Sequence, residues 1–152
     1  MNKTDQLINI QQSYCATIDY LNNYCRNNSS PDIEFLIGDM LFLDDGEPFD
    51  QAAWDDWIKA VNKLKSSRSA SIKNDTLTII EAYEVMINFL ENYACLTTSD
   101  EIKKFIQEKV ILKKNTIHNC NSWKEWITSV EKILAQNPLI LPLINFIKDD
   151  SH

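Results

Sequence analysis

Apolar side chains recur along this chain with the spacing of an α-helix. From about residue 8 to residue 26 they come in steps of four, four, three and four, at Ile10, Tyr14, Ile18, Leu21 and Cys25. From about residue 78 to residue 95 the same steps recur, at Ile79, Tyr83, Ile87, Leu90 and Ala94. This spacing places each set on one helical face. Each stretch opens with a pair at capping-box spacing, Asn9 with Gln12 and Thr78 with Glu81, so we predict two long helices.

The two predicted helices open two copies of a longer repeat, whose offset is 69 residues. The clearest match joins LDDGEPFDQAAWDDWIKAV at residues 43–61 to LKKNTIHNCNSWKEWITSV at residues 112–130. We call residues that are 69 positions apart counterparts: Trp54 and Trp57 in the first copy have Trp123 and Trp126 in the second. Because the pair recurs beside aliphatic residues, a role in the core is favoured over a ligand platform.

Each copy carries the pattern of two further helices. The first begins with Ser30 as N-cap and Pro31 at the first helical position, and stops at Gly38. Its counterpart begins in a capping box, Thr98-Ser99-Asp100-Glu101. The next helix begins with Asp50 as N-cap and places one arc of apolar side chains together, at Trp54, Trp57, Ile58, Val61 and Leu64. The connection before it, MLFLDDGEPF, is also compatible with a short strand pair, because short apolar runs are ambiguous.

These elements predict an all-α fold, a single compact helical domain over residues 1–152 built from two tandem three-element repeats. The first repeat spans about 8–64, a linker 65–75, the second repeat about 77–134, and a short C-terminal capping helix 137–148. A chain of 152 residues, 44% of them hydrophobic and 24% charged, is long enough for one core. The predicted core residues are Tyr14, Ile18, Leu21, Trp54, Trp57, Val61, Tyr83, Ile87, Leu90, Trp123, Trp126 and Val130.

The N-terminal sequence, MNKTDQLINIQQSY, lacks the continuous apolar run that a signal peptide needs, and no stretch is apolar for long enough to span a membrane. We therefore predict a cytoplasmic protein without a membrane partner, and a monomer is favoured. Cys15, Cys25, Cys95 and Cys120 contain no C-x-x-C pair, so we expect free thiols.

The two copies differ most in charge. Residues 32–57 of the first copy hold nine acids and no base, whereas the matching window 101–126 holds three acids and six lysines. Since the whole chain carries −7, this one window accounts for its excess negative charge. A charge run is ordinarily a solvated face, but nine uncompensated acids repel one another, and such a field speeds association with a basic partner. We predict a partner-binding surface at Asp39, Asp44, Asp45, Glu47, Asp50, Asp55 and Asp56.

Other chemistry finds little support in the residues. A net charge of −7 disfavours direct binding of nucleic acid, which needs a basic surface. An EF-hand loop placed on Gly46 would put Leu41 and Leu43 where carboxylates are required, and His118 with Cys120 is an isolated pair. Without a Gly-rich phosphate loop or a nucleophile motif, we predict no enzyme, no metal and no cofactor. Two clustered carboxylates acting as acid and base stay a further alternative.

The segment from Asp44 to Trp57, preceded by Phe35 to Met40, resembles small bacterial proteins with a D-G-x-P-x-D-x-A-A-W-x-D-W signature. The stretch from Glu81 to Tyr93 looks like the opening helix of the same family, the immunity proteins of contact-dependent growth inhibition and related polymorphic toxin systems. The resemblance implies a non-enzymatic protein that binds and blocks one cognate toxin, often a nuclease. In the second copy Asn119-Cys120-Asn121-Ser122 replaces Asp50-Gln51-Ala52-Ala53, so only the first copy would bind. The alternative is an acidic interaction or regulatory module unrelated to toxins.

Overall fold

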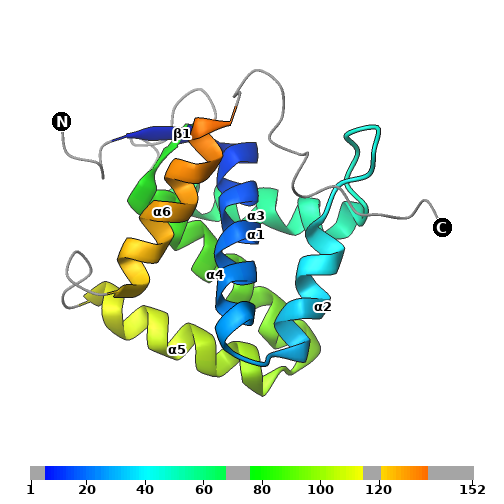
Figure 1. The fold of residues 1–152 in the computed structure, drawn as a ribbon, viewed down its shortest axis with the longest axis vertical. Coiled ribbons are helices and arrows are strands. Elements are labelled where there is room, and N and C mark those ends of the chain that lie inside the picture. The colour runs from blue at the N-terminus through cyan, green and yellow to red at the C-terminus, as the bar shows by residue number, and fades with distance from the viewer. Residues whose placement is uncertain (1–5, 68–75, 115–120, 137–152) are drawn as a thin grey trace.

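The structure is a computed structural model that describes residues 6–67, 76–114 and 121–136. In chain order it forms β1 (Leu7–Asn9), α1 (Ile10–Asn27), α2 (Pro31–Met40), α3 (Gln51–Ser67), β2 (Thr76–Thr78), α4 (Ile79–Thr97), α5 (Asp100–Lys114) and α6 (Asn121–Ala135). The prediction of an all-α compact domain is therefore confirmed (Figure 1). The predicted linker is shortened, because residues 65–67 belong to α3. The predicted capping helix at 137–148 lies outside the described residues.

Local capping signals define the start of both long helices. The Asn9 side chain accepts from the Gln12 backbone N–H at 2.6 Å, and the Gln12 side chain accepts in return from the Asn9 N–H at 2.9 Å. Thr78 and Glu81 repeat this exchange at 3.1 and 2.8 Å. Each box satisfies two of the backbone donors that the first helical turn leaves open. Both predicted capping boxes of α1 and α4 are confirmed.

The shorter helices α2 and α5 begin differently from the prediction. Ser30 stands at the N-cap of α2 but makes no capping hydrogen bond with its side chain, and the helix continues through Gly38 to Met40. At α5 the cap is Ser99, whose hydroxyl accepts from the Ile102 N–H at 3.2 Å. The predicted box of Thr98 with Glu101 is wrong, because the Glu101 carboxylate reaches across to Ser30, at 2.7 Å, instead.

A two-stranded antiparallel sheet, which the hydrophobic pattern did not predict, joins the two copies. Leu7 pairs with Thr78, Ile8 with Leu77 and Asn9 with Thr76. Ile8 and Leu77 are counterparts, so the register has the symmetry of a two-fold axis through that pair. The strand pair considered for MLFLDDGEPF is reduced, within the described residues, to an isolated antiparallel bridge between Phe42 and Pro48.

Aromatic rings form the centre of the core. The Tyr14 ring lies 5.0 Å from that of Trp54 and 5.4 Å from that of Trp57, both edge to face. The Tyr83 ring, its counterpart, lies 5.4 and 5.7 Å from the two tryptophan rings of the second copy. Of the predicted core residues only Trp54 is partly exposed, because it lines a shallow groove between the start of α1 and α3. The other eleven are buried.

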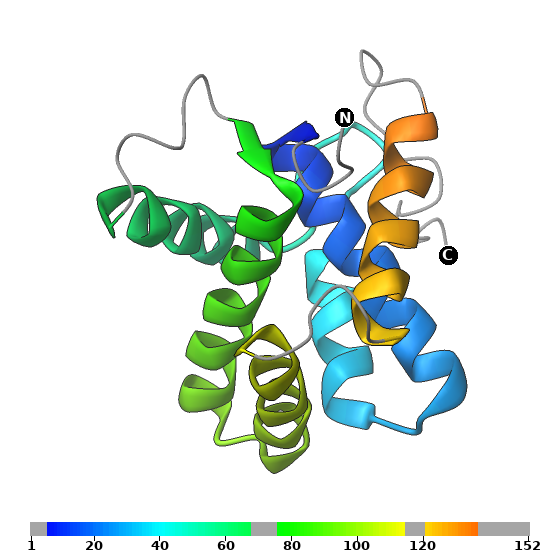
Figure 2. The same ribbon diagram turned by 90° about the vertical axis from the view of Figure 1, so that its left-hand side faces the viewer.

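The copies interlock through their long helices. α6 of the second copy packs along α1 of the first, and α3 of the first packs along α4 of the second, as Figures 1 and 2 show from two sides. α2 and α5 meet near their N-termini, where Ser30 and Ser99 bond across to the opposite helix. The 69-residue repeat stays an interpretation of the sequence.

Candidate protein-binding site

The connection between α2 and α3, residues 41–50, is an ordered turn that we call the acidic hairpin. Backbone hydrogen bonds close it, from Leu43 N to Glu47 O at 2.8 Å and from Phe49 N to Leu41 O at 2.9 Å. Three of its carboxylates are exposed to solvent, at Asp44, Asp45 and Glu47. The hairpin therefore holds these three predicted partner-binding residues, with Asp50 at its end, on a backbone fixed by main-chain hydrogen bonds.

Three residues of the sequence explain why the hairpin forms. Gly46 has a φ of 87°, a conformation that glycine adopts without the steric penalty of a Cβ. The Asp45 side chain accepts from the Glu47 backbone N–H at 3.0 Å, as aspartate commonly does in turns. Phe42 is buried and its ring lies 5.7 Å from that of Tyr14, so the base of the hairpin is anchored in the core.

The remaining predicted acids lie at the start of α3 and on α2. Asp50 caps α3 by accepting from the Ala52 N–H at 2.9 Å, and Asp55 accepts from the Gln51 side chain at 3.0 Å. Asp56 and Asp39 are half-buried. Among the residues that the structure describes, no lysine or arginine forms an ion pair with the acids of the hairpin and the start of α3, which are Asp44, Asp45, Glu47, Asp50, Asp55 and Asp56.

The fold brings some of these acids together around buried tyrosines. The pKa of Tyr14 is raised well above its usual value, mainly because the ring is buried and also because Cys15, then Asp50, Asp39 and Asp56 add negative potential. Asp39 and Asp50, which are eleven positions apart in the sequence, thus both add to the negative potential at Tyr14. Asp44, Asp45 and Glu47 are exposed to solvent instead.

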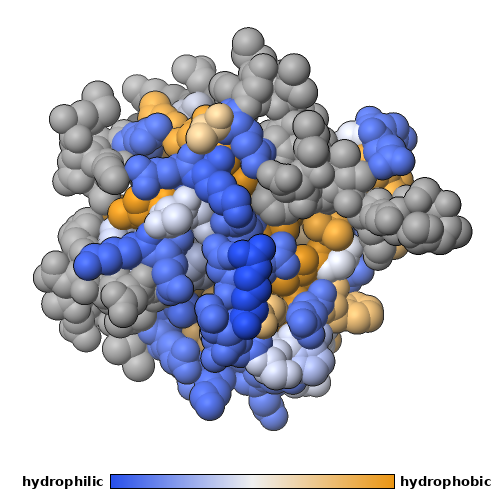
Figure 3. Space-filling model, in the orientation of Figure 1, coloured by the Kyte–Doolittle hydropathy of each residue, from blue (hydrophilic) through white to orange (hydrophobic). Residues whose placement is uncertain are grey.

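Exposed apolar side chains are a feature of the surface that the hydrophobic pattern did not reveal. Phe35 on α2 and Leu96 at the end of α4 are 69% and 72% exposed, more than Leu7 and Phe49. In Figure 3 apolar surface is visible beside α2, on a side of the molecule that is otherwise mainly hydrophilic. A comparison of the two copies indicates that these positions are exposed, because the counterparts of Phe35 and Leu96 are the polar residues Lys104 and Asn27.

A polar cavity of about 770 Å³ lies between α1, α5 and α6. Its lining includes Tyr24, Asn27, Lys104, Glu108 and Lys109. The Lys109 side chain is buried, and its ammonium lies 4.7 Å from the centre of the Phe105 ring, within the range of a cation–π contact. Both copies line the cavity, which contains none of the predicted partner-binding acids.

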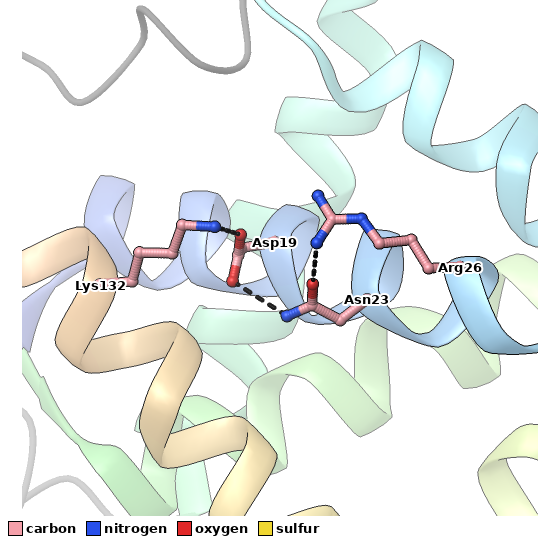
Figure 4. Close-up of polar contacts among 4 residues, drawn as sticks. All are labelled: Asp19, Asn23, Arg26 and Lys132. Atoms are coloured by element: carbon pink, nitrogen blue, oxygen red, sulfur yellow. Dashed lines mark hydrogen bonds and ion pairs between the residues drawn. The ribbon is translucent and has the colours of Figure 1, made fainter.

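A buried carboxylate on α1 has a structural explanation. Asp19 accepts from the Lys132 ammonium of α6 at 2.9 Å and from the Asn23 side chain at 3.4 Å, and Asn23 accepts in turn from Arg26 at 2.8 Å (Figure 4). The ion pair links α1 to α6, and the carboxylate is only 4% exposed. We assign Asp19 to helix packing, because its oxygens are occupied by neighbouring side chains.

The described residues contain free thiols and no cluster of metal-type ligands. Cys15, Cys25 and Cys95 are free, and burial raises the pKa of Cys15 to about 12. No group of three or more His, Cys, Asp or Glu side chains in this part of the chain is placed to hold a metal ion. His118 and Cys120 lie outside it. No described helix has both the length and the apolar character required to cross a membrane.

Comparisons with protein families, with curated proteins and with solved structures find no match to this chain. The resemblance to toxin-immunity proteins therefore rests on the quoted residues alone. What the structure adds is the position of those residues: the tryptophans pack toward the interior, whereas the hairpin acids face solvent.

Proposed function

We propose that this chain binds a basic protein through the acidic hairpin and the start of α3, without chemistry of its own. In its most specific form the proposal is an immunity protein, which neutralises a cognate bacterial toxin in the cytoplasm. The toxin would be a nuclease-type domain with a basic active or substrate-binding surface. The hairpin would occlude that surface and deny it to nucleic acid.

One observation carries the proposal: an ordered, core-anchored turn displays exposed carboxylates that no described base neutralises. Like charges held close together destabilise the compact state, and the second copy has lysines in the matching window. A field of this kind steers a partner of opposite charge and raises its association rate. Binding of a basic protein therefore explains both the charge and its confinement to one copy.

The resemblance supports the more specific form. The signature from Asp45 to Trp57 covers the hairpin and the start of α3, which are the parts that present the acids. A nuclease must hold a polyanion, so its binding surface is basic. An acidic module with another basic partner would use the same surface. The neighbouring genes distinguish the two functions: an adjacent toxin gene favours an immunity protein, whereas an operon of metabolic genes favours the other module.

The test is a charge-reversed variant assayed with the toxin domain encoded beside this chain's gene. Changing Asp44, Asp45, Glu47 and Asp56 to lysine should leave the helical content intact and abolish protection of cells that express the toxin. The matched control changes four exposed acids of the second copy by the same total charge, at Glu91, Glu108, Glu125 and Glu131. Full protection by the hairpin variant would refute the acidic-surface model, as would equal loss in the control.

A further inference from the structure

The symmetry between the copies points to a second part of the binding surface, on α2 and α4. Five residues that line the polar cavity have their counterparts there: Tyr24 corresponds to Tyr93, Asn27 to Leu96, Glu101 to Asp32, Lys104 to Phe35 and Glu108 to Asp39. We call Asp32, Phe35, Asp39, Tyr93 and Leu96 the Phe35 face.

Helix geometry and hydrogen bonding place these five residues together. Asp32, Phe35 and Asp39 are three and seven positions apart on α2 and share one side of the helix. Tyr93 and Leu96 do the same on α4. The Ser99 hydroxyl, at the corner between α4 and α5, donates to the Asp32 carboxylate at 2.6 Å and so links α2 to the end of α4.

Tyr93 is the aromatic residue of this face. Its pKa is raised, first by burial and then by the negative potential of Asp39, Asp32 and Asp50. Asp50 is the cap of α3 and the last residue of the acidic hairpin. Negative potential from the hairpin therefore adds to that of the Phe35 face.

The counterpart positions, on α1 and α5, have a different chemistry. There a lysine replaces Phe35 and an asparagine replaces Leu96, and the region is hollowed into the polar cavity. Lys109, which also lines the cavity, is the counterpart of the buried Met40. The Phe35 face thus has two highly exposed apolar side chains among acids, where the counterpart positions have polar groups around a cavity.

We infer that the Phe35 face is the apolar anchor of the protein interface, and that it receives aliphatic side chains of the partner flanked by lysine or arginine. This rests on the proposed function and names the partner's chemistry. Charge complementarity selects the occupant: Asp32 and Asp39 lie three and four positions from Phe35 on α2, so a basic segment is favoured over an acidic one. Apolar anchors mainly slow dissociation, whereas the hairpin charges mainly speed association.

A defined peptide tests the chemistry of the face without the natural partner. The probe is an amphipathic helical peptide with leucine at every third or fourth position and lysine elsewhere. Two comparison peptides replace leucine by serine or lysine by glutamate. Titration into the isotopically labelled full chain should shift the backbone amide signals of α2 and of the last turns of α4. Only the leucine–lysine peptide should shift these signals strongly. Shifts centred on the polar cavity, or equal binding of the serine peptide, would overturn the inference.

Counterpart exchange then tests the anchors. Phe35→Lys and Leu96→Asn install the residues of the counterpart positions, Lys104 and Asn27, at exposed sites, so the fold should be unaffected. Together they should weaken peptide binding at least about tenfold. Leu7→Thr is the matched control, because it also exchanges an exposed apolar residue, 55% exposed, for its counterpart Thr76. It should leave the affinity unchanged. Unaltered affinity of the double variant would contradict the assignment.

The natural partner separates this inference from the proposal beneath it. If Phe35→Lys with Leu96→Asn leaves dissociation of the toxin domain unchanged while hairpin reversal abolishes protection, the Phe35 face is wrong and the acidic hairpin stands. If the exchange speeds dissociation at least about tenfold while hairpin reversal has no effect, the apolar anchor stands and the hairpin proposal fails.

Discussion

Removing the Ser99 hydroxyl should destabilise the fold more than removing the Ser30 hydroxyl, although the two residues are counterparts. Each hydroxyl donates to a carboxylate on the opposite helix, Ser30 to Glu101 at 2.7 Å and Ser99 to Asp32 at 2.6 Å. Only Ser99 also caps its own helix, by accepting from the Ile102 N–H at 3.2 Å. Ser30 makes no such bond.

The difference between the two variants follows from these contacts. Ser30→Ala removes one hydrogen bond to a carboxylate, and Glu101 is exposed enough for water to replace it in part, so we expect a loss of about 1 kcal/mol. Ser99→Ala removes a bond to the half-buried Asp32 and also leaves the N-cap of α5 empty. The empty cap adds about 1 kcal/mol to the loss of stability. The expected loss for Ser99→Ala is therefore roughly 2 to 3 kcal/mol.

Urea unfolding of both variants and the parent, followed by tryptophan fluorescence and by circular dichroism, measures these losses. The midpoints should fall in the order parent, Ser30→Ala, Ser99→Ala with unchanged denaturant dependence. A double variant of Ser30→Ala with Glu101→Ala should lose less than the sum of the two single losses, because both changes remove the bond between these side chains. Equal losses for the two serines would refute the assignment of the cap to Ser99.

Three further predictions concern stability. Gly38→Ala should raise the free energy of unfolding by about 0.5 to 1 kcal/mol, because Gly38 lies within α2 with nothing near an added Cβ. Thr98→Gly should raise it by a similar amount, because glycine adopts the φ of 54° at this position without strain. Stability should fall above about pH 9, because the Cys15 thiol ionises in the unfolded chain and stays protonated in the folded one. Cys15→Ala should remove about 1.4 kcal/mol of that loss for each pH unit, as pH-dependent urea curves would show. Lys132→Met should cost about 1 to 3 kcal/mol in thermal or urea unfolding, because the buried carboxylate of Asp19 loses its charged partner, whereas the same change at an exposed, unpaired lysine should cost little.

The long helices could be predicted because their signals are local. Asn9 and Gln12, like Thr78 and Glu81, lie within one helical turn of each other, and the capping bonds form wherever the helix does. The role of Ser30 could not be predicted in this way, since its partner Glu101 is 71 residues away. The strands were missed because three residues are too few to show the alternation of a β-strand.

The candidate site was predictable as a set of residues but not as a surface. The excess of acids in one copy identifies the charge, yet the sequence alone does not show that Asp44 and Asp45 are exposed while Asp39 is half-buried. Nor does the hydrophobic pattern show that Phe35 is exposed while its neighbour Leu36 is buried. Exposure depends on where α2 packs, which is a property of the assembled helices.

The central claim is that the acidic hairpin of the first copy steers a basic protein partner. Its most direct test is the association rate of the toxin domain with the parent chain and with the charge-reversed variant, measured across a range of salt concentrations. The account predicts a fast rate that falls steeply with salt for the parent, and a slow rate with little salt dependence for the variant. Association of the variant at the parent's rate, with the same salt dependence, would contradict it.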